Sequence, residues 1–295
     1  MGDNIWDTIT NHITATTGAH LPECAARAVG GGCINSTYAL EGDGARYFVK
    51  LNDAAQLDMF AAEAQGLREL ARARAVRVPE PVCWGTSDSQ AYLVMEHIAF
   101  GGGTTRTAEA LGRQLAALHR VTRPQHGWDR DNTIGSTPQI NTPSHDWIAF
   151  WVERRLGYQL ELAARNGYGG RLQQRGEQLR ARLPQLLEGH TPAASLLHGD
   201  LWSGNYAADE SDAPVIFDPA VYYGDREAEL AMTELFGGFG PRFHAAYQEA
   251  WPLDPGYRVR KTLYNLYHIL NHLNLFGGGY GAQAERMMDV LLSEA

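Results

Sequence analysis

The sequence has few cysteines, an excess of acid over base, and no long apolar run, and each shortage excludes a class of protein. Its 295 residues include only three cysteines, Cys24, Cys33 and Cys83, with no C-x-x-C pair. This set predicts reduced thiols in the cytoplasm rather than a disulfide framework. With 25 basic and 34 acidic residues the net charge is −9, which offers no basic surface for nucleic acid.

Membrane attachment is also not expected from the sequence. No apolar run is long enough to cross a bilayer. Residues 1–6 lack the basic and apolar parts of a signal peptide and the Ser/Thr of a myristoylation motif. Hydrophobic residues make up 44% of the chain, which is enough to bury a large core in one two-lobed unit or in two domains.

The most specific pattern present is His198-Gly199-Asp200-Leu201-Trp202-Ser203-Gly204-Asn205, followed by Asp218 after a short apolar run. This is the H-x-D-x-x-x-x-N spacing of a kinase catalytic loop. Such chemistry needs one carboxylate to take the proton of the acceptor hydroxyl. It also needs an amide oxygen and a second carboxylate to hold Mg²⁺ on the nucleotide phosphates. We therefore predict Asp200 as the base and Asn205 with Asp218 as metal ligands.

A lysine and a glutamate upstream complete the expected nucleotide site. Tyr47-Phe48-Val49-Lys50-Leu51 is predicted to be a strand, and a lone lysine inside a strand is costly to bury without a partner. Glu63 lies thirteen residues later, within 54–73, which has helical spacing of apolar residues and no proline. The pair predicts the ion pair that positions ATP phosphates, although two solvated charges would give the same pattern.

A glycine-rich segment, Gly30–Tyr38, precedes this strand and is a candidate phosphate-covering loop. Glycines let backbone N–H groups approach phosphates closely. The predicted nucleotide contacts in this segment are Gly31, Gly32, Cys33 and Asn35. Asn35 stands where a third glycine would complete G-x-G-x-x-G, and it tolerates left-handed backbone geometry.

Taken in order, these segments resemble the fructosamine-3-kinase (ketosamine-3-kinase) family of the kinase-like superfamily. The resemblance also includes the segments 128–139, 153–160 and 217–229, of which Asp-Asn-Thr-Ile-Gly and Asp-Pro-Ala-x-Tyr-Tyr-Gly-Asp-Arg-Glu are the most specific. It implies an α+β, bilobal protein-kinase-like fold with a small β-rich N-lobe (1–98) and a larger, mostly helical C-lobe (99–295). Backbone groups of Glu96, His97 and Ile98 would face the adenine, and 99–105 would be a linker.

The resemblance further implies an ATP- and Mg²⁺-dependent kinase that phosphorylates O3 of a ketosamine, a small sugar-amine adduct, with protein lysines as a possible carrier of that adduct. Gly199 in place of the arginine of His-Arg-Asp, and the lack of Asp-Phe-Gly, argue against a regulated protein kinase. Alternatives are an aminoglycoside or other small-amine kinase and a nucleotide-binding pseudokinase.

Two substrate contacts are predicted less directly. Trp202 would offer an apolar face to sugar carbons, with core packing as the alternative. For Asp225, in Asp225–Glu229, the resemblance implies a structural or a substrate-side role, whereas spacing alone predicts a solvated charge cluster. His268 and His272 could share one helix face, but no third metal ligand is evident, so we expect ordinary helix packing.

Overall fold

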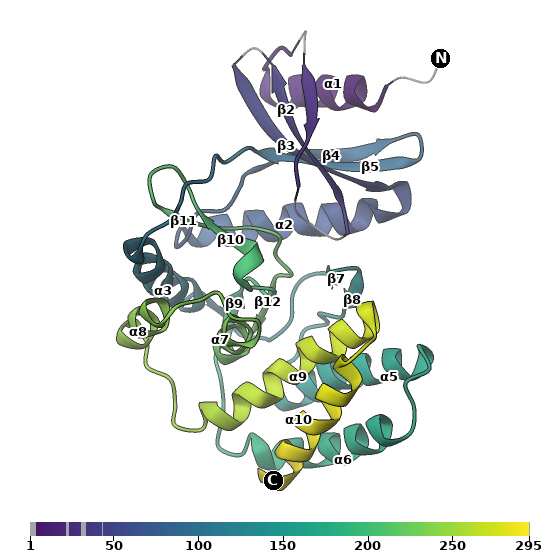
Figure 1. Ribbon diagram of the computed structural model, residues 1–295, viewed down its shortest axis with the longest axis vertical. Coiled ribbons are helices and arrows are strands. Elements are labelled where there is room, and N and C mark those ends of the chain that lie inside the picture. Colours follow the sequence, from purple (N-terminus) through teal and green to yellow (C-terminus); the bar gives the residue numbers. More distant parts are fainter. Residues whose placement is uncertain (1–3, 22–23, 31–33, 43, 295) are drawn as a thin grey trace.

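The molecule has two lobes, one above the other in Figure 1. The computed structural model describes residues 4–21, 24–30, 34–42 and 44–294. The N-terminal lobe is an antiparallel sheet with a helix on each face, and the C-terminal lobe is mainly helical. This confirms the expected bilobal α+β fold. The predicted division at residue 98 falls in the segment between the last strand of the N-terminal sheet, which ends at Glu96, and the helix that begins at Thr105.

The N-terminal sheet has five strands in the order β1-β2-β3-β5-β4, and every pair is antiparallel. Its strands are β1 (Ala25–Ala28), β2 (Ser36–Gly42), β3 (Ala45–Asp53), β4 (Pro81–Ser87) and β5 (Gln90–Glu96). Lys50 lies in the central strand β3, opposite Leu93 of β5. A side chain on a central strand has little access to water, so Lys50 needs partners within the protein.

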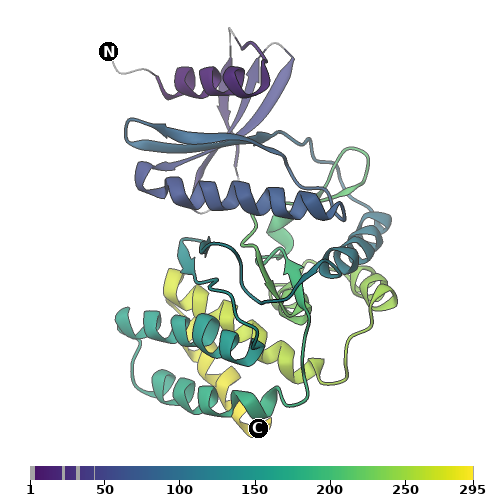
Figure 2. The same cartoon turned by 180° about the vertical axis from the view of Figure 1, so that it is seen from behind.

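Two helices cover the faces of this sheet (Figures 1 and 2). Helix α1 (Ile5–Thr17) buries Ile9 and Ile13 against one face, in a small core with Val49 and Val94. Helix α2 (Leu57–Ala73), entered through the 3₁₀ turn η1 (Ala54–Gln56), packs on the other face. The apolar spacing within 54–73 had predicted a helix there, and α2 confirms it.

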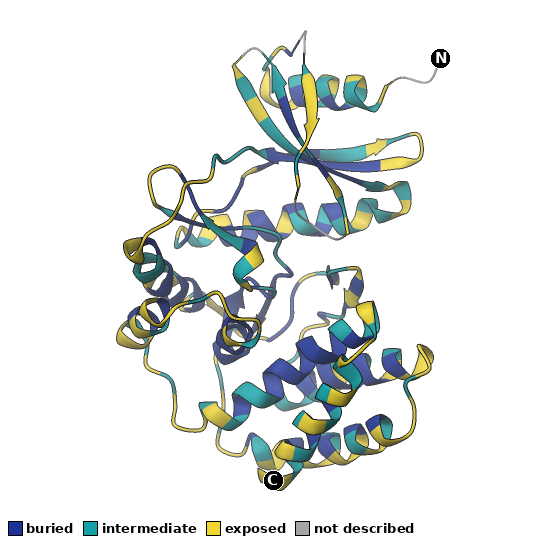
Figure 3. Ribbon diagram, viewed as in Figure 1, coloured by how far each residue is buried: buried dark blue, intermediate teal, exposed yellow. Residues whose placement is uncertain are grey.

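The C-terminal lobe is built mainly from helices, of which α9 (Tyr257–Phe276) is largely buried, as its dark blue colour in Figure 3 shows. Its α-helices are α3 (Thr105–His119), α4 (Trp147–Phe150), α5 (Tyr158–Arg165), α6 (Arg171–Leu186), α7 (Arg226–Leu235), α8 (Pro241–Ala250), α9 (Tyr257–Phe276) and α10 (Tyr280–Glu294). A π-helical stretch, η2 (Trp151–Gly157), joins α4 to α5. Helix α3 packs on α8, while α7 and α10 both pack on α9.

Short strands also occur in this lobe, which the mostly helical expectation did not include. They are β6 (Thr122–Arg123), β7 (Asn132–Ile134), β8 (Thr137–Gln139), β9 (Ala194–Leu197), β10 (Tyr206–Ala208), β11 (Pro214–Ile216) and β12 (Tyr222–Gly224). Strands β12, β9 and β6 form one small sheet, and β7-β8 and β10-β11 are hairpins. Strands of two to four residues contain too little alternation to be recognised in a sequence.

The lobes are held together by a buried acid on α2. The Glu69 carboxylate accepts hydrogen bonds from Tyr223 Oη at 2.7 Å and Arg123 Nη2 at 2.9 Å, both in the C-terminal lobe. Arg72, on α2 itself, donates a third at 2.9 Å. A second link is made by Arg77, which pairs with Asp209 across the lobe junction. Because Glu69 lies on the helix that carries Glu63, these bonds fix α2 relative to the C-terminal lobe.

No helix in the described ranges combines the length and the apolar character required to span a membrane.

Replacing Glu69 by alanine tests this link. The change leaves Tyr223 and Arg123 without their buried acceptor, so we expect the free energy of unfolding to fall by roughly 2–3 kcal/mol. Urea unfolding followed by far-UV circular dichroism measures the loss. Glu177→Ala, which removes an exposed i,i+3 pair with Arg180, is the matched control and should change stability little. Equal effects of the two changes would contradict the role given to Glu69.

Candidate active site

The segment 198–205 forms a loop between β9 and β10 that brings Asp200 and Asn205 together. The Asn205 amide donates to the Asp200 backbone oxygen at 2.9 Å and to its carboxylate at 3.3 Å. Gly199 has a φ of +87°, and a Cβ there would lie 2.0 Å from the Ala220 carbonyl oxygen. Only glycine fits this conformation and this close approach, which explains why the arginine of His-Arg-Asp is absent.

A buried glutamate on α7 binds the backbone of this loop. Glu229 accepts hydrogen bonds from the backbone N–H groups of His198 at 3.1 Å and Gly199 at 2.7 Å. The same carboxylate is bonded to His119 Nε2 at 2.9 Å. Burial alone raises the pKa of Glu229, but the bond to His119 and the neighbouring donors outweigh it and hold that pKa below its ordinary value. The loop therefore rests on a fixed negative charge inside the C-terminal lobe.

Lys50 joins the two lobes at the centre of the site. Its Nζ lies 2.7 Å from Glu63 of α2 and 2.5 Å from Asp218, which follows β11. Burial alone lowers the pKa of Lys50, but the Asp218 and Glu63 carboxylates outweigh it, so the pKa is raised and the ammonium stays charged. The structure thus brings together the strand lysine and the helix glutamate that their spacing had predicted. It adds Asp218 as a second partner.

The Asp200 carboxyl group has an unusual acidity for its residue type. Its burial, followed by the negative charge of Asp218, raises the pKa of Asp200 from 3.8 to about 7. Near neutral pH the group therefore exchanges a proton readily, which suits a general base. His198 beside it is kept neutral, because burial lowers its pKa, and its Nε2 lies 2.8 Å from the Phe217 carbonyl oxygen.

Asn205 and Asp218 have the chemistry of a magnesium site. The Asn205 amide nitrogen is used in hydrogen bonds within the loop, which leaves its Oδ1 as the atom able to bind a cation. The Asp218 side chain is 43% exposed and lines the same cleft as Asn205. Asp218 has a φ of +58°, a strained value for a residue other than glycine. Amide and carboxylate oxygens in one cleft fit the hard-oxygen preference of Mg²⁺.

A cleft of about 380 Å³ between the lobes collects seven of the eleven predicted site residues that the structure describes. Those that line it are Asn35, Lys50, Glu63, Asp200, Trp202, Asn205 and Asp218. The Trp202 indole is 40% exposed and lies over Gly204, so it belongs to the cleft wall and not to the core. A cleft of this size suits a small-molecule ligand.

The other predicted nucleotide contacts either lie outside the described residues or make different contacts. Gly31, Gly32 and Cys33 lie outside the described residues. Asn35 is not among the described residues with positive φ, and its side-chain oxygen instead accepts from Asn52 Nδ2 at 2.7 Å. At the lobe junction, 96–98 lies away from the lining of this cleft.

The backbone N–H of Glu96 donates to the Glu80 oxygen at 2.8 Å, so this group is not available to an adenine. The Glu96 carbonyl oxygen is the backbone group left to face an adenine, and Glu96, His97 and Ile98 stay predicted contacts.

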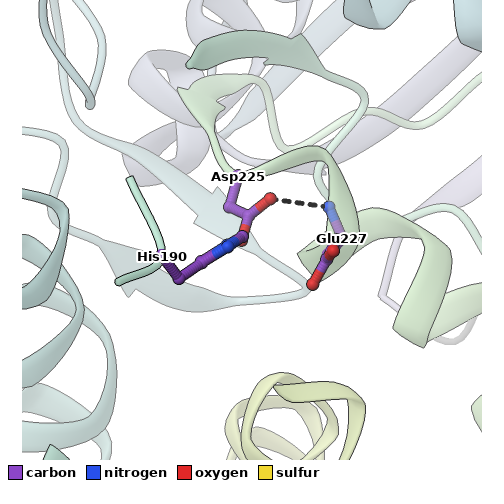
Figure 4. A group of neighbouring side chains, drawn as sticks. All are labelled: His190, Asp225 and Glu227. Atoms are coloured by element: carbon purple, nitrogen blue, oxygen red, sulfur yellow. Dashed lines mark hydrogen bonds and ion pairs between the residues drawn. The ribbon is translucent and has the colours of Figure 1, made fainter. Parts of the chain in front are cut away.

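The structure does not bring Asp225 to the cleft. Asp225 is 1% exposed, caps α7 through the Glu227 N–H, and lies beside His190 (Figure 4), whose Nε2 is 2.6 Å from its carboxylate. Tyr264 Oη donates to the same carboxylate at 2.5 Å. These bonds outweigh burial and keep the pKa of Asp225 low. The solvated charge cluster suggested by spacing is also wrong, because Arg226, Glu227 and Glu229 are all buried.

His190, Asp225 and Glu227 lie close enough together to raise the question of a metal ion. Glu227, however, is already neutralised by Arg260, whose Nε and Nη2 lie 2.6 and 2.9 Å from its two carboxylate oxygens. A guanidinium in this position would repel a cation. The cluster is therefore a hydrogen-bonded support for the start of α7.

Sequence reasoning missed two parts of the site. One is Glu229, whose contacts with the loop 198–205 span some thirty residues of sequence and leave no local pattern. The other is a group of rings at the cleft mouth, around His272 of α9. His268 and His272 do pack within the helix as expected, since His272 Nδ1 donates to the His268 oxygen at 2.8 Å.

The fold and the site define a phosphotransferase of the kinase-like class that acts on a hydroxyl group. The chain is similar in fold to an aminoglycoside phosphotransferase, APH(4)-Ia, with a TM-score of 0.63 at 15% identity over 97% of this chain and 98% of that one. The likeness is greater to a candidate fructosamine-3-kinase from Thermobifida fusca, with a TM-score of 0.86 at 32% identity over 98% and 99% of the two chains.

Sequence comparison identifies the particular family. The fructosamine kinase family model matches residues 5–294, and the chain belongs to that family. It is 49% identical to the probable ketoamine kinase of Synechocystis, over 96% of this chain and 95% of that one. It is 47% identical to the chloroplastic protein-ribulosamine 3-kinase of Arabidopsis thaliana, over 89% of this chain and 81% of that one.

The raised pKa of Asp200 predicts a dependence of stability on pH. Between pH 3.8 and about 7, Asp200 is protonated in the folded protein and ionised in the unfolded chain. The free energy of unfolding therefore falls as pH rises through this window. Asp200→Asn cannot lose this proton. We expect the ligand-free variant to melt at a higher temperature than wild type above pH 7, with the difference vanishing near pH 4.

Thermal melts across this pH range by differential scanning calorimetry measure the effect. The exposed Asp254→Asn is the control and should not reproduce the trend. If the melting temperature of Asp200→Asn minus that of wild type is the same at every pH, Asp200 does not have the raised pKa.

Proposed function

We propose that the protein is an ATP-dependent ketosamine kinase that phosphorylates the O3 hydroxyl of a sugar-amine adduct. The observation that carries this proposal is the convergence of Lys50, Glu63, Asp200, Asn205 and Asp218 on one interlobe cleft in a member of the fructosamine kinase family. The relatives named for ketoamine and ribulosamine kinases support the acceptor class.

ATP is the proposed phosphoryl donor, and its phosphates would lie between Lys50 and the loop that contains Asn35. Lys50 neutralises phosphate charge, and Glu63 keeps its ammonium aimed into the cleft. Asn205 and Asp218 would hold Mg²⁺, which when bound neutralises charge on the phosphates. In the ligand-free protein Asp218 pairs with Lys50, so this pair has to loosen when the nucleotide enters.

Asp200 is the proposed base for the acceptor. Its carboxylate takes the hydroxyl proton as the oxygen bonds to the transferred phosphorus, and ADP leaves. A ketosamine has its carbonyl at C2, between the amine-bearing C1 and the reacting C3. Phosphate on O3 is therefore lost after enolisation, and water then releases the amine from the resulting sugar fragment. This sequence would remove the adduct and restore the amine, which is a deglycation reaction.

Two other functions are less well supported. Aminoglycoside kinases share the fold, but at 15% identity that likeness carries no substrate. A pseudokinase would be expected to lack part of the catalytic set, whereas Lys50, Asp200, Asn205 and Asp218 are all present and line the cleft. The proposal covers free ketosamines and glycated protein lysines, because both carry the same reacting hydroxyl group.

Removing the base should stop catalysis and leave nucleotide binding. We expect Asp200→Asn to lower kcat on the order of 10²–10⁴-fold, the usual span for loss of a general acid–base group. Titration calorimetry with a nonhydrolysable ATP analogue should show nearly unchanged affinity. By contrast, Asp218→Ala should weaken Mg²⁺-dependent nucleotide binding as well as turnover. Near-normal turnover by purified Asp200→Asn would refute its assignment as the base.

The acceptor class is tested by direct competition. Ketosamines made from fructose, ribulose and erythrulose are offered together with kanamycin and a serine peptide, and products are mapped by ³¹P and ¹H NMR. We expect phosphate on O3 of the ketosamines and little on the other acceptors. A stable phosphate at another position, or preference for kanamycin, would assign the chain to the aminoglycoside kinases instead.

A further inference from the structure

The exposed apolar side chains of the described residues gather at the mouth of the active-site cleft. Six large apolar side chains are exposed in the described ranges, namely Ile34, Phe100, Trp202, Phe236, Phe276 and Val290. Four of them, all except Phe100 and Val290, line the cleft. Apolar residues scattered singly over a surface need no explanation, whereas a gathered group marks a binding surface.

Aromatic rings form the outer part of this surface. The ring centroid of His272 lies 4.7 Å from that of Phe236, 5.5 Å from Phe276 and 5.2 Å from Tyr280. Phe236 follows α7, His272 and Phe276 lie at the end of α9, and Tyr280 begins α10. We name these four residues the aromatic rim. Their separate origins show that the rim is assembled by the packing of three helices.

The apolar surface continues from the rim to the N-terminal lobe. A Cβ on Gly135, in the turn between β7 and β8, would lie 3.0 Å from Leu275 Cδ1 and 3.3 Å from Ile34 Cδ1. Leu275 of α9 and Ile34 of the N-terminal lobe therefore flank this turn on the cleft side. The mouth of the cleft is thus apolar on both lobes, while the floor with Asp200 and Asp218 is charged.

Much of the surface at the rim offers a sugar hydroxyl no hydrogen-bond partner. Burying a hydroxyl without a partner is costly, and the side chains of Phe236, Phe276 and the neighbouring Leu275 offer none. His272 Nδ1 already donates to the His268 oxygen. The nearby Asn271 amide already donates to the Ile134 oxygen at 3.3 Å and accepts from Gln159 at 3.2 Å. Methylene groups, which need no such partner, fit this surface.

We propose that the aromatic rim binds an aliphatic chain on the substrate amine and so sets the preference among ketosamines. The inference rests on the proposed function. With O3 at Asp200, the amine is only two carbons further along the substrate, so its substituent continues from the charged floor toward the mouth. Because the rim is at the exposed mouth, the far end of that chain can remain in solvent, attached to a polypeptide.

A pair of acceptors that differ only in the amine tests the rim. Fructose adducts of n-hexylamine and of methylamine carry the same sugar and the same reacting hydroxyl. Burial of about two of the five additional methylene groups on the exposed rim favours binding of the hexylamine adduct, so wild type should phosphorylate it with kcat/KM about tenfold higher. We expect Phe236→Ala and Phe276→Ala each to reduce this selectivity ratio about threefold to fivefold.

Val290→Ala is the matched control, because it truncates an exposed apolar side chain of α10 outside the cleft, and it should leave the ratio at its wild-type value. Circular dichroism of each variant checks that the fold is retained. The proposed role of the rim would be wrong if wild type phosphorylated both adducts with equal kcat/KM. It would also be wrong if the ratio were unchanged in folded Phe236→Ala and Phe276→Ala. Either result would leave the kinase assignment in place. Failure to phosphorylate either adduct would overturn both proposals.

Discussion

A buried ammonium held between two carboxylates is the interaction on which the cleft depends. Lys50 lies in the central strand of the N-terminal sheet, where water cannot solvate its charge. It is stable there because Glu63 of α2 and Asp218 of the C-terminal lobe both contact it. One charge thus fixes the sheet, the helix and the second lobe relative to each other. The same three groups are the ones that have to rearrange around nucleotide phosphates.

Further buried charges support this arrangement in the C-terminal lobe. Glu229 holds the backbone of the catalytic loop, and Glu227 is paired with Arg260 on α9. Buried carboxylates are costly unless each is fully hydrogen-bonded, and here the described donors satisfy them. The result is a rigid, charged floor for phosphoryl transfer beneath an apolar mouth. This contrast suits a substrate with a polar reacting end and an apolar chain at its amine.

Much of the site could be predicted from sequence because its chemistry depends on local spacing. Asp200 and Asn205 are five residues apart in one loop, so their separation along the chain fixes their separation in space. Lys50 and Glu63 were recognisable for a related reason, since a strand and the following helix pack as neighbours. Asp225 was misplaced, because an acid beside other charges looks solvated unless its distant partners His190 and Tyr264 are known.

The sequence by itself thus determined the class of fold, the catalytic loop and the lysine–glutamate pair. The resemblance of motifs along the chain to the family implied the fold class, whereas the catalytic loop and the lysine–glutamate pair are encoded by residues near one another in the chain. The tertiary structure alone decided that Asp218 contacts Lys50, that Glu229 supports the loop, and that the aromatic rim exists. Those features join residues from different helices and strands, and burial and ring packing between them arise only when the elements fold against each other.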